Sequence, residues 1–120
     1  MVMYELNFRK PADAETQAAD VYIPAESQWF SGHFPGNPVL PGIAQLGMVY
    51  DVIRHALNQG IKLVEINRVK FKRMILPEDR LTVMAVSRSG HSGTYAFRLV
   101  QDEELICSGT MTVAPDSGTE

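Results

Sequence analysis

The chain has 120 residues, which is the length of one domain rather than two. It is 45% hydrophobic and 21% charged, and its formal net charge of −3 argues against general nucleic-acid binding, which needs a basic excess. The single cysteine excludes an internal disulfide and is typical of a reducing compartment. The sequence has neither a signal-peptide pattern nor a run of the roughly 20 apolar residues that span a bilayer. We therefore expect a soluble, cytoplasmic domain that binds neither nucleic acid nor membrane.

The first part of the chain predicts a hairpin followed by a long loop. Met3 to Phe8 alternates apolar and polar residues, as strands do, and Gln17 to Ile23 is predicted to be a second strand. Lys10 to Asp13 predicts the turn between them. The loop from Pro24 to Pro41 holds four prolines and two glycines.

A long helix is predicted next, from Pro41 to about Asn58. Proline suits the first helical position, and Gly60 is expected to end the helix in the left-handed conformation. Apolar residues cover nearly the whole circumference of this helix, which predicts a buried helix. They are Ile43, Leu46, Tyr50, Ile53 and Leu57 on one face and Ala44, Met48, Val49, Val52 and Ala56 over much of the rest.

The residues after the helix predict strands joined by turns, with a polar tail at 115–120 that is expected to fray. The strands are Lys62 to Met74, Leu81 to Val86, Tyr95 to Val100 and Leu105 to Val113. An antiparallel sheet wrapped around one helix covers both elements, which predicts an α+β fold in one domain, 1–120. Such a sheet leaves an open edge strand, and we expect a second copy to cover it in a dimer.

One segment carries chemistry, the run Gly-His-Phe-Pro-Gly-Asn-Pro-Val-Leu-Pro-Gly at 32–42. It places His33 on a loop that ends at the start of the predicted helix. Histidine acts as a base near neutral pH. The first helical amides, at Gly42 and Ile43, have no intrahelical acceptor and can polarise a carbonyl oxygen. A base beside such donors suits proton abstraction next to a thioester carbonyl.

This run resembles the signature of the hotdog-fold (3R)-hydroxyacyl-[acyl carrier protein] dehydratases. The resemblance continues through 66–79 and 107–111 and covers Trp29 to Ala114, about 70% of the chain. It implies a dimeric hotdog fold, with further assembly into a trimer of dimers as an option. It implies that His33 removes the proton alpha to the thioester and that the Gly42 amide holds the carbonyl oxygen. A helix acid of the other subunit then helps the 3-hydroxyl to leave as water.

The resemblance also implies the ligands of the site. The acyl group arrives on the phosphopantetheine of an acyl carrier protein, or on coenzyme A, and no other cofactor is needed. Substrate contacts are expected at Phe34, Pro41, Ile43, Gly47 and Tyr50. The sequence spacing of His and Cys gives no indication of a metal site.

The chain departs from the family pattern at the helix acid. The acid is expected fourteen residues after the histidine, and Gly47 stands there. Asp51, one turn further, is a candidate for a relocated acid, but a carboxylate at a dimer interface or in a cap is the favoured interpretation. Tyr50 is either a proton donor or a core residue. The chain also lacks the longer N-terminus of housekeeping members, so it resembles shorter members of aryl-polyene or polyketide-type clusters more closely.

Basic side chains gather after the helix and suggest a docking surface. Arg68, Lys70 and Lys72 alternate along one face of the predicted strand, with Arg73 after them. The alternatives are a solvated strand face and a surface that docks an acidic carrier protein. Simpler roles are expected elsewhere, namely a solvated or dipole-paired His55, a surface His91 and an inert core thiol at Cys107.

The sequence thus predicts a 3-hydroxyacyl-thioester dehydratase of fatty acid or polyketide-type synthesis, a lyase that gives a trans-2-enoyl thioester. An acyl-thioester hydrolase is one alternative, since that reaction is common on this fold. A second is a catalytically impaired subunit that binds acyl chains. In that case, a homodimer has two impaired sites. A heterodimer with a related dehydratase has one complete site, made from His33 and the partner's acid.

Overall fold

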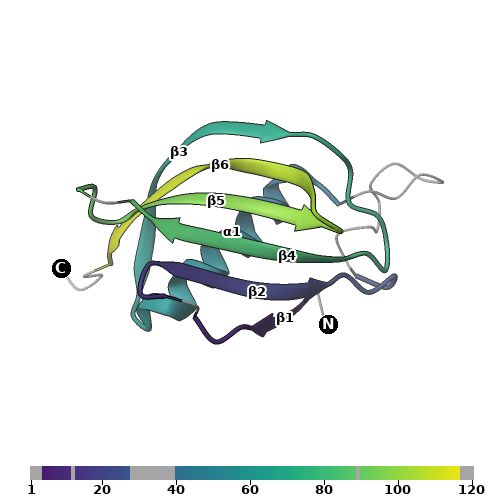
Figure 1. The fold of residues 1–120 in the computed structure, drawn as a ribbon, viewed down its shortest axis with the longest axis horizontal. Coiled ribbons are helices and arrows are strands. Elements are labelled where there is room, and N and C mark those ends of the chain that lie inside the picture. Colours follow the sequence, from purple (N-terminus) through teal and green to yellow (C-terminus); the bar gives the residue numbers. More distant parts are fainter. Residues whose placement is uncertain (1–3, 12, 28–39, 89, 117–120) are drawn as a thin grey trace.

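The computed structural model describes residues 4–11, 13–27, 40–88 and 90–116, and in this part of the chain it shows one helix and one sheet (Figure 1). The elements are β1 (Glu5–Phe8), β2 (Thr16–Tyr22), α1 (Gly42–Leu57), β3 (Ile61–Phe71), β4 (Arg80–Ser87), β5 (Thr94–Gln101) and β6 (Glu104–Pro115). All strand pairs are antiparallel, in the order β1-β2-β4-β5-β6-β3. The predicted hairpin, helix and strand series are therefore confirmed.

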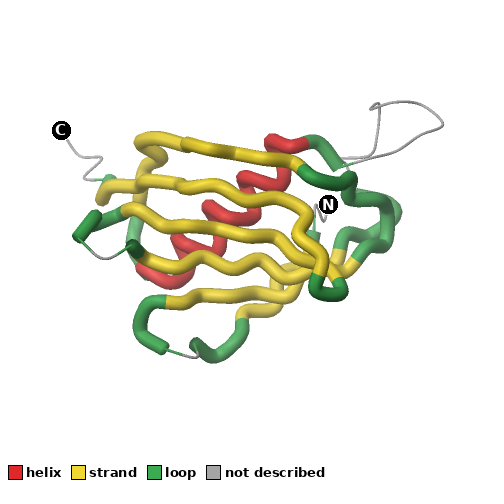
Figure 2. The backbone as a smooth tube through the Cα atoms, turned by 45° about the horizontal axis from the view of Figure 1, so that its top comes forward, coloured by secondary structure: helices red, strands yellow, loops and turns green. Residues whose placement is uncertain are grey.

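Helix α1 lies across one face of the curved sheet, as Figure 2 shows. Its inward side packs on β2, β3 and β4. The core between the two layers is apolar, and its largest fully buried side chains include Phe97, Met48 and Ile53. Burial of such side chains contributes about 1.5–3 kcal/mol each relative to exposure, which holds the helix on the sheet. No helix within the described ranges is long and apolar enough to cross a membrane.

Both predicted ends of the helix need correction. Pro41 is the N-cap residue rather than the first helical residue, because its φ and ψ of −64° and 153° are those of extended backbone. At the other end, Asn58 rather than Gly60 takes the left-handed conformation, with φ 51° and ψ 41°. The Asn58 N–H donates to the Arg54 carbonyl at 3.0 Å. Asparagine tolerates this conformation better than most residues, so the helix ends at Leu57 and its C-cap lies two residues before the glycine.

The prediction of a helix buried all round is wrong for a single chain. Ile43 is 67% exposed, and Leu46, Gly47 and Tyr50 are only partly buried. Apolar exposure continues on and after the edge strand, at Leu63, Val64, Phe71, Met74 and Leu76. The sheet of one copy covers one side of α1 only, and this is why part of its apolar surface stays open.

Edge strand β3 carries two irregularities in its pairing with β6. The register shifts between Leu63 and Glu65 and again between Asn67 and Lys70. Each shift inserts one extra residue into β3, which is a β-bulge. Ile66 and Val69, three residues apart, consequently both pack against the core. The predicted alternation of Arg68, Lys70 and Lys72 along one face is wrong, because the bulge interrupts it and β3 ends at Phe71.

Candidate active site

The N-terminal end of α1 presents backbone donors. Its first turn has no acidic residue, and the N-cap Pro41 makes no side-chain hydrogen bond. The Pro41 carbonyl accepts from the N–H groups of Ala44 and Gln45, at 3.1 and 3.3 Å. The N–H groups of Gly42 and Ile43 precede these bonds at the positive end of the helix dipole. Such donors stabilise negative charge on an oxygen, so the geometry suits the oxyanion role predicted for Gly42.

The Phe71 ring packs directly on the backbone of Gly42. A Cβ atom at residue 42 would lie 2.8 Å from Phe71 Cζ, which is closer than real Cβ contacts. Because glycine has no Cβ atom, the Phe71 ring can pack against the end of the helix and form an apolar wall there. A hollow of about 570 Å³ surrounds this contact, and its lining residues are Leu40, Gly42, Gln45, Phe71, Lys72, Arg73 and Met74.

Gln45 adds a buried polar group to the same hollow. Gln45 is 3% exposed, and its side-chain oxygen has no hydrogen-bond partner among the described residues. A buried carbonyl oxygen normally accepts at least one hydrogen bond. The hollow at the helix end therefore combines an apolar wall with a free acceptor and backbone donors.

Gly47 stands at the position of the expected helix acid, and the group beside it is a tyrosine hydroxyl. A Cβ atom at residue 47 would meet, among the described atoms within 4 Å, the Tyr4 hydroxyl at 3.8 Å. That hydroxyl donates a hydrogen bond of 2.6 Å to Asp51 Oδ2. Burial, and then the bonded carboxylate of Asp51, raise the pKa of Tyr4 above the ordinary value of 10.0. The tyrosine therefore keeps its proton and gives it to Asp51 as a hydrogen bond.

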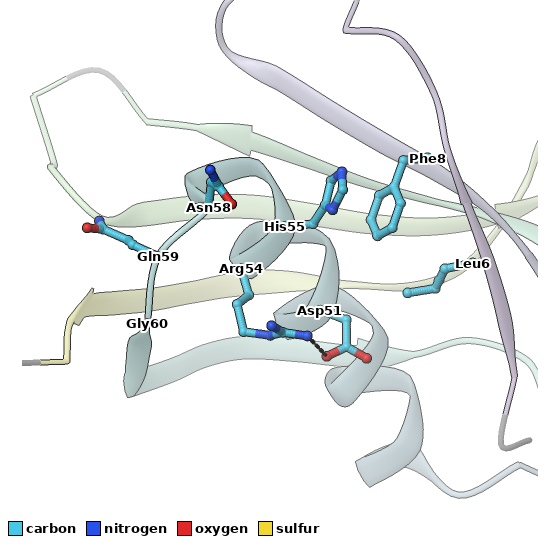
Figure 3. A pocket seen from close by; sticks show the side chains of 8 residues that line it. All are labelled: Leu6, Phe8, Asp51, Arg54, His55, Asn58, Gln59 and Gly60. Carbon is cyan, nitrogen blue, oxygen red and sulfur yellow. Dashed lines mark ion pairs between the residues drawn. The ribbon is translucent and has the colours of Figure 1, made fainter. Parts of the chain in front are cut away.

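Asp51 lines a second hollow, of about 500 Å³, towards the other end of the helix (Figure 3). Its Oδ1 lies 3.9 Å from Arg54 Nη2, so each of its oxygens faces a donor. The rings of Phe8 and His55 stack beside it, with centroids 3.6 Å apart. This hollow is lined by Leu6, Phe8, Asp51, Arg54, His55, Asn58, Gln59 and Gly60. Within one chain the structure thus separates Asp51 from Gly42.

The other predicted substrate contacts are placed as follows. The Tyr50 hydroxyl donates to the Ile61 carbonyl at 2.7 Å, which ties α1 to the start of β3. Its proton is therefore engaged within the chain. Pro41 and Ile43 lie at the open end of the helix, with Ile43 largely exposed. His33 and Phe34 lie outside the described residues, so their roles stay predictions.

The basic residues differ in how free they are. Arg73 is held by Glu104 and by Gln101, whose side-chain oxygen lies 2.7 Å away. Arg68 sits in the second bulge with a left-handed φ of 58°. Lys70 and Lys72 are exposed, and Lys72 lines the hollow beside Gly42. The docking role stays a prediction, with Lys72 the member nearest to the helix end.

Two expectations about isolated residues can be compared with the structure. Cys107 is buried, and burial raises the pKa of its thiol to about 11, as suits an unreactive core residue. His91 is exposed, in the turn between β4 and β5. Across the described ranges, no three His, Cys, Asp or Glu side chains lie close enough to hold a metal ion.

Comparison with known proteins decides the family. The family model described as ApeI-like, for the ApeI dehydratase, matches residues 9–110. The chain belongs to the ApeI-like dehydratase family. FabZ, the 3-hydroxyacyl-[acyl-carrier-protein] dehydratase, from Streptococcus pyogenes serotype M1 is 36% identical to this ApeI-like chain over 97 residues, which cover 72% of the chain and 68% of FabZ. FabZ from Syntrophomonas wolfei is 30% identical over 95 residues, covering 72% and 66%. The predicted resemblance is confirmed.

Solved structures confirm the hotdog fold of this ApeI-like chain. A chain of the dehydratase heterocomplex ApeI:P from Xenorhabdus doucetiae superposes with a TM-score of 0.81 at 24% identity, covering 92% of this chain and 96% of that one. A mutant thioesterase from Pseudomonas aeruginosa gives a TM-score of 0.62 at 22% identity, with coverage of 92% and 81%. At these identities the similarity establishes the fold.

Sequence reasoning missed three residues that the structure brings to the site. Phe71 is predicted only as a strand residue, and its place in the site is not. The signal that could have singled it out is an aromatic residue between two lysines. Gln45 stands among apolar helix residues, and a polar residue at a buried helix position is a recognisable signal. Tyr4 has no local signal at all, because its partner Asp51 is 47 residues away.

Proposed function

We propose that the chain is a dehydratase of carrier-bound 3-hydroxyacyl thioesters in fatty acid or polyketide-type synthesis. The observation that supports this most is the helix end, where the Gly42 backbone lies under the Phe71 ring with a donor N–H at the positive end of α1. That arrangement receives a thioester carbonyl whose oxygen gains negative charge. Family membership supplies the reaction type.

The reaction needs one base and one oxyanion site. His33 takes the proton from Cα, and the electron pair of that C–H bond becomes the Cα=Cβ bond as the Cβ–O bond breaks. The protonated histidine returns a proton to the departing hydroxyl, which leaves as water. The negative charge on the thioester oxygen is held by the Gly42 N–H. Water and a trans-2-enoyl thioester are the products. The acyl group is carried on phosphopantetheine of a carrier protein or on coenzyme A, and because the elimination involves no net oxidation, no further cofactor is required.

A dehydration assay with two histidine variants tests this proposal. Purified protein is given a 3-hydroxyacyl pantetheine thioester, and the conjugated enoyl product is followed by absorbance. We expect turnover by the wild type and a loss of about 100-fold or more in His33→Ala, as for removal of a catalytic base. His91→Ala is the matched control, because His91 is exposed in a turn, and it should keep the wild-type rate. Release of free acid without enoyl product would instead show a thioesterase.

A subunit of a mixed dimer is the second candidate, and the middle of α1 favours it. Gly47 offers no carboxylate, and both oxygens of Asp51 already face donors of the same chain. In a pair with a related dehydratase that keeps the helix acid, one site combines His33 with the acid of the partner. The opposite site contains Gly47 and lacks the acid.

Mixing experiments separate this candidate from the first. The mixed dimer requires that activity appear only after a related dehydratase with the acid is added, and that it be lost in His33→Ala of this chain, whereas the first candidate gives turnover by the purified chain alone. Removing the helix acid of the added protein should abolish activity equally, whereas removing the histidine of the added protein should change little. Equal sensitivity to both histidines would contradict a dimer with one complete site.

We also propose that β3 is the edge along which two chains pair, whether identical or related. β3 is a terminal strand of the sheet, and Leu63 and Val64 on it are 47% and 57% exposed. Val64→Lys should convert the dimer to a single chain of 13.3 kDa in sedimentation. Val86→Lys is the matched control, since Val86 is also exposed but lies on interior strand β4. Dissociation by both variants alike would contradict this edge.

Carrier docking is proposed at the basic side chains near the hollow. Lys72 lines the hollow with Gly42, and Lys70 is exposed on β3. Opposite charge steers an acidic carrier protein to such a surface. Lys72→Glu should raise KM about tenfold for a carrier-bound substrate and leave KM for the pantetheine substrate unchanged. Lys62→Glu, at the far end of β3, is the control that should change neither value.

A further inference from the structure

Among the described residues, the atom that lies beside Gly47 within 4 Å of an added Cβ is a hydroxyl oxygen from another element. Tyr4 precedes β1, and its oxygen lies 3.8 Å from the place of a Cβ atom at residue 47. A carboxylate on a side chain at residue 47 would reach the same volume. The group that faces this space is therefore a phenol supplied by the N-terminal segment.

The Tyr4 hydroxyl is fixed in its orientation. It donates its proton to Asp51 Oδ2 at 2.6 Å, and Arg54 lies on the other carboxylate oxygen at 3.9 Å. Tyr4 also packs against the hydrophobic core, so its ring does not swing freely. With its proton committed to Asp51, the phenol oxygen presents lone pairs, which accept a hydrogen bond from a hydroxyl group.

We propose that Tyr4 is a substrate-positioning residue that accepts a hydrogen bond from the 3-hydroxyl of the acyl chain, in the place that Gly47 leaves empty. The inference rests on the proposed dehydratase function. Asp51 is then a positioning residue that acts through Tyr4. Gly47 contributes by leaving room for the substrate hydroxyl beside the phenol oxygen.

This arrangement gives a balanced elimination without a helix acid. The histidine of this site comes from the second copy, as the proposed pairing of two chains implies. It takes the proton from Cα and returns the same proton to the 3-hydroxyl as the Cβ–O bond breaks, so that water leaves. Tyr4 transfers no proton and ends the reaction as it began. Its contribution is to hold the hydroxyl where the protonated histidine can reach it.

The test measures binding of two ligands that cannot react. One is 3-hydroxybutyryl pantetheine amide and the other is butyryl pantetheine amide, in which nitrogen replaces the thioester sulfur and the acyl chains differ only at the 3-hydroxyl. Titration calorimetry gives the ratio of the two dissociation constants. We expect the wild type to prefer the hydroxylated ligand about tenfold, as one hydrogen bond in a partly buried site allows.

Three variants assign that preference. Tyr4→Phe should bring the ratio to about 1 by weakening the hydroxylated ligand alone. Tyr22→Phe is the matched control, because it removes the phenol hydroxyl of a β2 residue outside the proposed site, whose ring lies 4.4 Å from the Arg80 guanidinium, and it should keep the ratio. Gly47→Ala adds a Cβ atom at ordinary contact distance from Tyr4 Oη, so it folds and should lower the preference by crowding the hydroxyl.

The outcomes distinguish this inference from the proposed function. Equal binding of both ligands by the wild type, or a preference that survives in Tyr4→Phe, overturns the role of Tyr4 and leaves the dehydratase proposal standing. Binding of neither ligand overturns the dehydratase proposal itself. A preference that Tyr4→Phe and Gly47→Ala both reduce, while Tyr22→Phe retains it, supports the assignment.

Discussion

The two halves of α1 use their polar groups in opposite ways. At the N-terminal end the donors belong to the backbone of Gly42 and Ile43, under the ring of Phe71. In the middle, Asp51 accepts a hydrogen bond from Tyr4 and faces Arg54, so both of its oxygens already have donors of the same chain. A group that is satisfied by its own chain stabilises the fold, and a group that is left open is available to a substrate. The comparison supports the proposal that the oxyanion site lies at the helix end.

Gly42→Ala should cause the largest loss. The new methyl group would meet Phe71 Cζ at 2.8 Å, so either the ring or the helix end must shift. A displacement of about 1 Å at an oxyanion donor is expected to lower the dehydration rate about 100-fold. The measurement is kcat/KM with a 3-hydroxyacyl pantetheine thioester.

A second substitution shows whether the Phe71 contact is the cause. Phe71→Leu in the Gly42→Ala background removes the ring atoms that the methyl group meets, and it should recover part of the rate. An unchanged rate in Gly42→Ala alone would contradict the position of the oxyanion site. Circular dichroism confirms that the variants keep their helix.

Asp51→Ala should act mainly on stability. It leaves the partly buried Tyr4 hydroxyl without its charged acceptor, and loss of such a bond costs about 1–2 kcal/mol after allowance for partial exposure. The expected change is a lower free energy of unfolding in urea. Activity should fall by less than the roughly 100-fold that marks a general acid. A larger loss of rate at unchanged stability would move Asp51 into the reaction and break the contrast between the two halves.

The Tyr4–Asp51 pair should also give the protein an alkaline limit. Burial and the Asp51 carboxylate raise the pKa of Tyr4 in the folded chain, so the unfolded chain loses this proton at lower pH. The stabilisation is complete below the ordinary pKa of 10.0 and decreases as pH rises above it. In Tyr4→Phe, the free energy of unfolding should decrease less steeply with pH above 10.0. Burial raises the pKa of Tyr95 as well, so a smaller slope should remain.

Cys107 should show the smallest effect of all. Its thiol is buried, and burial raises its pKa to about 11, so little thiolate exists at neutral pH. Native protein should react with an aromatic disulfide reagent far more slowly than the protein unfolded in guanidinium. Fast labelling of the folded chain would indicate that the sheet opens at β6.

Much of the fold could be predicted because its signals are local. Alternation located the strands to within a few residues, and the proline-rich loop located the start of α1. The bulges in β3 could not be predicted, because neither Val64 nor Arg68 is a glycine, the residue that often marks a bulge. The apolar pattern of β3 also fits a strand with or without the extra residue. The uncovered side of α1 was missed for a related reason, because apolar composition does not say whether the chain's own sheet or a second chain covers a face.

The candidate site was predictable where one segment carries it. Gly42 was found because it ends a distinctive loop motif, whereas Phe71, which packs on it, comes from a strand far along the chain. The hydrogen bond between Tyr4 and Asp51 depends on how β1 crosses the helix. Such contacts are set by tertiary packing and have no counterpart in residue spacing.

The two edges of the sheet together set how far this protein can assemble. β1 is four residues long. Directly after it, the Arg9 guanidinium donates two hydrogen bonds, of 2.7 and 3.0 Å, to the Asp20 carboxylate of β2. A short edge strand next to an exposed Arg–Asp ion pair is a poor template for pairing with another strand. β3 is long, but its bulges bend it away from a flat ribbon. The proposed pairing along β3 about a two-fold axis would use up the long edge of both chains, so growth would stop at a closed pair instead of continuing into a fibre.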